Sequence, residues 1–131
     1  KSSSDLCLTG PGMTQDEYRT QFALWCMWSS PLTLSFDLTK PLTADDKAII
    51  TNADLIAIDQ DAMGQQAEFV GQEGNIYYFM KDLENGDVAI SATNVGPTQQ
   101  QVTFDFAKFS ALNAKGRYQA RDCQAQKNLE N

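Results

Sequence analysis

The sequence predicts an α/β segment followed by an all-β segment, in which the last strand–helix units of a (β/α)8 barrel lead into an antiparallel β-sandwich. Apolar residues recur at helical spacing in two stretches that flank a short apolar run at residues 32–36. From residue 65 onward the apolar period changes to two, which is typical of strands. A complete barrel takes about 250 residues, so 131 residues hold only the end of one. We therefore expect residues 1–61 to belong to a barrel and residues 62–131 to form an incomplete β-sandwich domain.

The first predicted helix covers residues 14–29 and follows the end of a short strand. Thr14 and Glu17 have the spacing of a capping box, in which each side chain bonds the backbone N–H of the other. Pro31 ends the helix, because the residue before a proline avoids the helical conformation. The apolar stripe expected to face the core consists of Tyr18, Phe22, Trp25 and Cys26.

Residues 32–36 are too short a run for a helix and are predicted to form a buried strand, parallel to the segment around Asp5. A second helix begins at Thr43, with two aspartates in its first turn, where the helix dipole favours acidic side chains. Asn52 is a candidate to close this helix, and either Asn52 or Asp54 is expected to cap the short apolar turn at residues 55–58.

The second part of the chain has the pattern of short antiparallel strands separated by turns. Asn85 and Gly86 predict a tight hairpin turn, because this pair readily adopts the left-handed conformations that such turns need. Residues 71–74 are predicted to form another turn. The expected strands are residues 67–70, 76–80, 87–92, 101–106 and 117–122.

Composition excludes several classes of function. The net charge of −7 repels phosphate backbones and anionic membrane surfaces, so we expect neither a nucleic acid nor a membrane as partner. The chain contains no histidine, which rules out a Ser-His-Asp or Cys-His site within it and leaves no zinc site of the common type. We therefore expect no metal and no other cofactor. A homo-oligomer stays open.

The chain has three cysteines, Cys7, Cys26 and Cys123, which is an odd number and includes no CxxC motif. This pattern favours free buried thiols and a reducing compartment such as the cytoplasm. A secreted protein stays an alternative.

Three separated blocks carry a resemblance to a known family. They are Gly12-Met-Thr-x-x-Glu-Tyr-Arg-x-x-Phe-x-Leu-Trp25, Pro31-Leu-x-x-x-x-Asp37-Leu and Ile56-Ala-Ile-Asp-Gln-Asp-x-x-Gly64. In this order and spacing they resemble the C-terminal part of the α-galactosidases of glycoside hydrolase family 27 (melibiases). The resemblance implies a TIM-type (β/α)8 barrel that ends near residue 61 and a β-sandwich that lacks its final strands.

The resemblance also implies a retaining glycosidase that removes terminal α-linked galactose with two carboxylates about 5–5.5 Å apart. Both carboxylates are implied to lie upstream of this chain, so no residue here receives a catalytic role and the chain alone is expected to be inactive. Asp5 matches the last Asp of the family's Asp-Pro-Asp-Met-Leu motif and Leu6 takes the position of its Met, and both are implied to contact the galactoside substrate. Ser3 and Ser4 replace Asp-Pro, and Leu6 and Cys7 replace Met-Leu, departures that bear on sugar preference.

Other functions stay open beside this one. Within the family, the same scaffold fits an α-N-acetylgalactosaminidase or a β-L-arabinopyranosidase, whose distinguishing pocket residues are implied to lie upstream. A different class is a non-catalytic carbohydrate-binding or structural β-domain.

Three further carboxylates have a structural interpretation that we favour over a binding one. Asp37 follows the predicted strand at residues 32–36, and Asp59 and Asp61 follow the apolar turn. We expect all three to cap turns, because aspartate side chains readily accept bonds from nearby backbone N–H groups.

The aromatic residues are also expected to pack rather than to bind sugars. Trp25 and Trp28 lie on the first predicted helix, where Trp25 belongs to the core stripe. Tyr77 and Tyr78 point to opposite faces of one strand, so one should be in the core and the other is a candidate carbohydrate contact.

Overall fold

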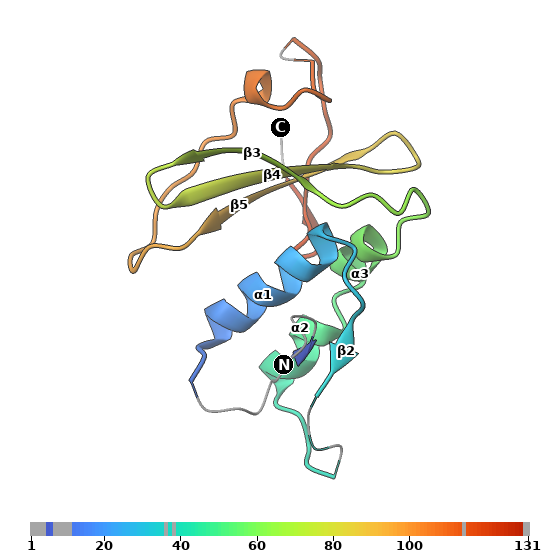
Figure 1. Cartoon of the computed structure of the whole chain (residues 1–131), viewed down its shortest axis with the longest axis vertical. Helices are drawn as coiled ribbons and strands as arrows, with labels where there is room; N and C mark the ends of the chain where they lie inside the picture. The colour runs from blue at the N-terminus through green and yellow to red at the C-terminus, as the bar shows by residue number, and fades with distance from the viewer. Residues whose placement is uncertain (1–4, 7–11, 36, 38, 114, 130–131) are drawn as a thin grey trace.

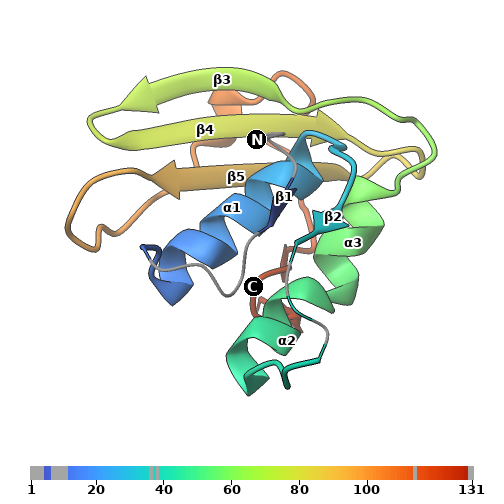
Figure 2. The same cartoon turned by 60° about the horizontal axis from the view of Figure 1, so that its bottom comes forward.

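The computed structural model describes residues 5–6, 12–35, 37, 39–113 and 115–129, which stack in three layers (Figure 1). A three-stranded antiparallel sheet forms the middle layer. The helices of the first part cover one face of this sheet, and residues 102–112 cover the other (Figures 1 and 2). The chain then returns to the helix side, where Arg121 pairs with Asp54 of the third helix.

Helix α1 (Gln15–Met27) has the start and the core face that the sequence predicts. The Thr14 hydroxyl accepts from the Glu17 amide at 3.3 Å, and the Glu17 carboxylate accepts from the Thr14 amide at 2.6 Å, which completes the capping box. The helix ends two residues earlier than predicted, because Ser29 adopts a left-handed backbone with φ of 48°. Its buried side chains are Tyr18, Phe22, Trp25, Cys26 and Met27.

Strands β1 (Asp5–Leu6) and β2 (Thr33–Leu34) confirm the predicted parallel pair. Asp5 lies opposite Thr33 and Leu6 opposite Leu34, and α1 connects the two strands. This is a β-α-β unit, the building block of a parallel barrel. The strand is shorter than the predicted residues 32–36, of which Phe36 lies outside the described residues.

Helices α2 (Ala44–Ile50) and α3 (Ala53–Asp59) follow β2. The Thr43 hydroxyl caps α2 as predicted, accepting from the Asp46 amide at 3.1 Å. Of the two roles left open for Asn52, the structure has the second: its side-chain oxygen accepts from the Leu55 amide at 3.1 Å and caps α3, while Thr51 closes α2.

The sheet consists of β3 (Glu68–Glu73), β4 (Ile76–Asp82) and β5 (Val88–Asn94), with β4 in the centre. The hairpin turn at Gly86, with φ of 85°, is confirmed. The turn predicted at residues 71–74 is confirmed only at its last residue, because β3 continues to Glu73 through a bulge between Phe69 and Gly71. The chain reverses instead at Gly74, whose φ of 56° suits glycine.

The strand predicted at residues 101–106 is wrong, and that at residues 117–122 is confirmed only for two residues. Among the described residues, no neighbouring strand pairs with residues 101–106, which run irregularly into the 3-10 helix η1 (Phe106–Lys108). Strand β6 (Arg121–Asp122) forms a hairpin with β7 (Lys127–Asn128).

Two apolar clusters hold the layers together. The first lies between the helices and the sheet, and its buried members are Tyr18, Phe22, Trp25, Cys26, Met27, Ile49, Leu55, Ile58 and Ala89. The second lies on the opposite face of the sheet, and its buried members are Ile76, Tyr78, Met80 and Phe109. Alternate residues of β4 therefore serve two different cores, which explains why this strand is apolar on both faces.

Candidate functional site

The residues predicted to contact sugar, Asp5 and Leu6, form strand β1. Since β1 and β2 run in the same direction, their carboxyl ends meet at one edge. In (β/α)8 enzymes this end of the strands carries the active site. The backbone position of Asp5 and Leu6 is thus one from which a sugar can be reached, and the contact itself stays a prediction.

The prediction of a buried strand at residues 32–36 is wrong for this chain, because strand β2 is exposed. Thr33 and Leu34 are both exposed, and Leu34 retains 42% of its accessible surface. Strands of a parallel barrel are normally buried on both faces and rich in apolar residues. β2 is therefore an uncovered strand of a parallel pair in this chain.

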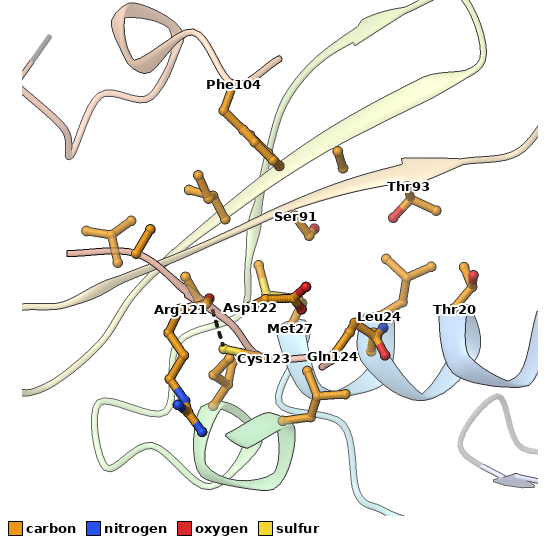
Figure 3. A pocket seen from close by; sticks show the side chains of 18 of the residues that line it. Thr20, Leu24, Met27, Ser91, Thr93, Phe104, Arg121, Asp122, Cys123 and Gln124 are labelled. Atoms are coloured by element: carbon orange, nitrogen blue, oxygen red, sulfur yellow. Dashed lines mark hydrogen bonds between the residues drawn. The ribbon is translucent and has the colours of Figure 1, made fainter. Parts of the chain in front are cut away.

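A wide groove of about 2000 Å³ separates α1 from β5 and from residues 117–124 (Figure 3). Leu24 and Met27 line it from α1, Ser91 and Thr93 from β5, and Phe104 from the upper layer (Figure 3). The Ser91 hydroxyl is buried there without a hydrogen-bond partner in the described part of the chain. Pockets for small molecules usually measure about 300–1,000 Å³, so the groove is too large for one sugar. Its β5 wall is a sheet edge that can accept a further strand.

Asp37 and Asp61 cap turns, as predicted. Asp37 accepts from the Thr39 amide at 3.0 Å and from the Thr39 hydroxyl at 2.6 Å. These bonds, led by that from the hydroxyl, lower the pKa of Asp37. Asp61 accepts from the Met63 and Glu84 amides, each at 3.1 Å. Asp37 is thus bonded within its own turn, and Asp61 bonds both its own turn and the hairpin between β4 and β5.

Asp59 differs from the prediction. It is the last residue of α3 and is only 5% exposed. One carboxylate oxygen accepts from the side-chain nitrogen Nε2 of Gln60 at 2.5 Å, and the other has no hydrogen-bond partner among the described residues. Burial raises the pKa of Asp59. The carboxylate therefore caps no turn and lies inside the contact between helices and sheet.

Lys81 is a buried polar residue that we did not single out from the sequence. It lies in β4 and is 1% exposed, on the face that carries Tyr77 and Phe79. The sequence does contain a sign of this burial, because Lys81 follows Tyr77 and Phe79 on one face of the strand, and a lysine on an otherwise aromatic face is unusual. Buried lysines normally have partners.

The predicted packing of the tryptophans is confirmed. Trp25 is 6% exposed in the first cluster, and Trp28 packs edge-to-face on Phe79 with ring centroids 5.9 Å apart. Tyr78 is the core member of its pair, and Tyr77 is half-buried on the other face. A carbohydrate contact by Tyr77 stays a prediction.

Cys26 and Cys123 are free thiols, as predicted, while Cys7 lies outside the described residues. Cys26 is fully buried, and burial raises its pKa to about 12. Because the thiolate is the reactive form, we expect Cys26 to resist iodoacetamide at about pH 8 in the folded chain and to react completely in urea. Peptide mass spectrometry measures this directly, with the half-buried Cys123 as internal comparison.

The raised pKa of Cys26 predicts that the stability of the folded chain falls at alkaline pH. The folded thiol holds its proton up to a pKa of about 12 against the ordinary value of 9.0, so its contribution to stability is present below pH 9 and is lost between pH 9 and 12. Rapid alkylation of Cys26 under native conditions would contradict this burial.

Among the residues that the structure describes, no three metal-ligating side chains gather into a group. The longest described helix, α1, has 13 residues, and none of the helices in the described ranges is long and apolar enough to cross a bilayer.

Family models and curated relatives match both parts of the chain. The model described as Alpha galactosidase A matches residues 2–61, and that described as Alpha galactosidase C-terminal beta sandwich domain matches residues 73–131. The chain is 39% identical over 88 residues to α-galactosidase A of Aspergillus niger, covering 67% of this chain and 16% of that protein. It is 35% identical over 103 residues to α-galactosidase A of Cellvibrio japonicus, covering 79% of this chain and 25% of that protein.

Solved structures agree in fold. α-Galactosidase I from Mortierella vinacea superposes with a TM-score of 0.88 and 28% identity, over 95% of this chain and 32% of that chain. A family 27 β-L-arabinopyranosidase from Geobacillus stearothermophilus has a TM-score of 0.78 over 93% of this chain and 28% of that chain, and its 21% identity speaks for the fold alone.

The chain spans a quarter or less of the length of these two curated relatives. The two matched ranges follow one another in the order of catalytic part and β-sandwich domain. The parallel β1–α1–β2 unit and the antiparallel sheet behind it have the architecture that this order requires. The chain therefore belongs to the melibiase family, glycoside hydrolase family 27, and is a C-terminal part of such a protein.

Proposed function

We propose that this chain is the closing part of a retaining glycosidase that removes terminal α-linked galactose from oligosaccharides, and that the chain alone is inactive. The observation that carries the proposal is the parallel pair β1–β2, in which β2 is exposed and which suits the closing edge of a catalytic barrel. The curated relatives reported above are α-galactosidases, which supports the choice of sugar.

The proposed inactivity follows from the chemistry. Retaining glycosidases need two carboxyl groups about 5–5.5 Å apart on either side of one glycosidic bond. Such groups must be held within about 0.5 Å of the productive geometry by their surroundings. Here Asp37, the carboxylate that follows β2, is bonded to its own turn, and β2 is uncovered. An open edge of this kind cannot hold a catalytic pair.

Asp5 and Leu6 are the residues of this chain that we propose to contact the galactoside in the complete barrel. Asp5 would accept a hydrogen bond from a sugar hydroxyl, and Leu6 would bound the pocket on its apolar side. Bonds between a carboxylate and a hydroxyl are worth about 1.5–3 kcal/mol each. The proposed reaction uses no metal and no other cofactor.

Activity on a neighbouring sugar is the second candidate. The fold is shared with a β-L-arabinopyranosidase, and Ser3 and Ser4 depart from the family motif next to Asp5. An α-N-acetylgalactosaminidase is the other possibility within the family. The test therefore compares the three sugars.

The experiment joins residues 1–131 to the upstream part of Mortierella vinacea α-galactosidase I, in place of the matching segment of that enzyme. The chain alone and the chimera are tested on chromogenic α-galactoside, α-N-acetylgalactosaminide and β-L-arabinopyranoside. We expect no hydrolysis by the chain alone and hydrolysis of the α-galactoside by the chimera. Asp5→Asn should lower kcat/KM of the chimera about 10- to 100-fold, by loss of a charged hydrogen bond.

Asp45→Asn, which removes an exposed carboxylate of α2, is the matched control and should leave kcat/KM unchanged. Hydrolysis by the chain alone would contradict the proposed inactivity. A folded chimera that prefers one of the other two sugars would replace the proposed substrate. Binding of galactose to the chain alone, measured by calorimetry, would favour a carbohydrate-binding domain instead.

A further inference from the structure

The contact between the helices and the sheet contains a buried cation. The ammonium group of Lys81 donates to the Ser29 hydroxyl at 2.7 Å, to the Ile58 carbonyl at 2.5 Å and to the Cys26 carbonyl at 3.4 Å. Lys81 comes from β4, whereas its three acceptors lie in or next to α1 and α3. One side chain of the sheet is thus bonded to two different helices.

The acceptors explain how a charge is tolerated there. The carbonyls of Cys26 and Ile58 lie in the last turns of α1 and α3, where each helix dipole is negative. The carboxylates of Asp59 and Asp61 add negative charge and oppose the effect of burial, which nevertheless lowers the pKa of Lys81. Asp59 is itself buried and keeps one oxygen without a partner in the described residues. The helix ends and the two carboxylates therefore offset only part of the cost of burying the Lys81 ammonium group.

Ser29 adds a second unusual feature. Its amide donates to the Cys26 carbonyl at 3.3 Å, and the Ser30 amide donates to the Trp25 carbonyl at 3.0 Å, which is a Schellman motif at the end of α1. The left-handed position of this motif is normally glycine, yet here Ser29 occupies it with φ of 48°. Its hydroxyl accepts from Lys81 and donates to the Gln65 carbonyl at 2.9 Å. The strained residue thus supplies a hydroxyl that joins α1 to the chain entering the sheet.

We propose that Lys81 and Ser29, with the carbonyls of Cys26 and Ile58, form a sheet–helix lock, a buried polar cluster that fixes one orientation of the sheet on the helices and adds no net stability. The apolar cluster around it is compatible with more than one arrangement, because apolar contacts have no preferred direction. Hydrogen bonds do have a preferred direction, so bonds from one ammonium group to two helix ends favour a single arrangement. Buried charges fix a unique structure in some proteins at a cost in stability.

The first test uses urea unfolding of the 131-residue chain with two probes. Fluorescence of Trp25 and Trp28 reports on α1, and amide exchange of β4 reports on the sheet. Lys81→Met keeps the aliphatic stem and leaves Asp59 buried without its counter-charge, so the urea midpoint should fall by on the order of 1 M. Lys115→Met, which removes an exposed lysine, should leave the midpoint unchanged.

The double variant Lys81→Met/Asp59→Asn tests whether the cluster fixes the orientation of the sheet on the helices independently of its effect on stability. Without either charge, the midpoint should return to the wild-type value or rise above it. The two probes should then no longer report one transition, because the helices and the sheet can separate before the sheet unfolds. Coincident transitions in this variant would overturn the proposal, as would a Lys81→Met midpoint equal to that of Lys115→Met.

If Lys81→Met does not fold, the variant Ser29→Gly tests the proposed lock instead. A glycine relieves the left-handed backbone and, with no lock present, would raise the midpoint. With the lock present, loss of the hydroxyl should lower the midpoint and separate the two probes. A raised midpoint with coincident probes would overturn the proposal.

Discussion

Phe22→Ala is expected to lower the free energy of unfolding by about 3–5 kcal/mol. Phe22 is 2% exposed and lies in the middle of α1, within the cluster shared by the helices and the sheet. Truncation removes a large buried surface and leaves a cavity in this cluster, which its close-packed neighbours cannot close without moving. A domain is stable by only about 5–15 kcal/mol, so the loss is a large part of the total. Urea unfolding monitored by tryptophan fluorescence measures it.

Phe69→Ala is the matched control for this truncation. Phe69 is 58% exposed on β3 and contacts only the rings of Tyr77 and Phe79 among the aromatic residues described. We expect it to cost about 1 kcal/mol or less, which is the range of one aromatic contact at a surface. Equal losses in the two variants would contradict a core centred on α1.

The first part of the chain could be predicted closely because its signals are local. Thr14 with Glu17, and Thr43, each bond backbone groups within three residues, so the sequence alone places the helix starts. The parallel pairing of residues 33 and 34 with Asp5 and Leu6 followed from the resemblance to a barrel as well as from the pattern.

The failures in the second part have a common physical reason. The alternation of Val102, Phe104 and Phe106 indicates a strand, but a strand also needs a neighbour with which to pair. Within the described residues none pairs with this segment, so Phe104 and Phe106 pack individually, on Tyr78 and on Tyr118. The turn predicted from Gly71 failed similarly, since pairing with β4 keeps that glycine within β3.

The environment of Lys81 and Asp59 could not be predicted from local patterns. Strand alternation assigns Lys81 to one face of β4, yet nothing in the sequence says that two helix ends meet that face. Asp59 follows an apolar turn in a pattern equally typical of a cap. Only the packing of α3 against the sheet buries both charges together.

The backbone amide of Leu34 in β2 is expected to exchange its hydrogen much faster than amides in the centre of the sheet. In the 131-residue chain β2 is exposed and pairs with two residues only, so its amide should exchange at close to the unfolded rate. Amides in the centre of β4 open only on global unfolding and should exchange slower by about 10³-fold or more. In the chimera with the Mortierella vinacea barrel, strands should pair with both edges of β2, and the barrel interior and the outer helices should cover its two faces.

Hydrogen exchange at Leu34, measured in the chain alone and in the chimera, therefore tests most directly whether residues 1–61 are the closing edge of a barrel. We predict fast exchange in the chain alone and protection similar to that of β4 in the chimera. Slow exchange of Leu34 in both proteins would mean that β2 is complete without further strands. Fast exchange in a folded, active chimera would mean that β2 is not part of the closed barrel.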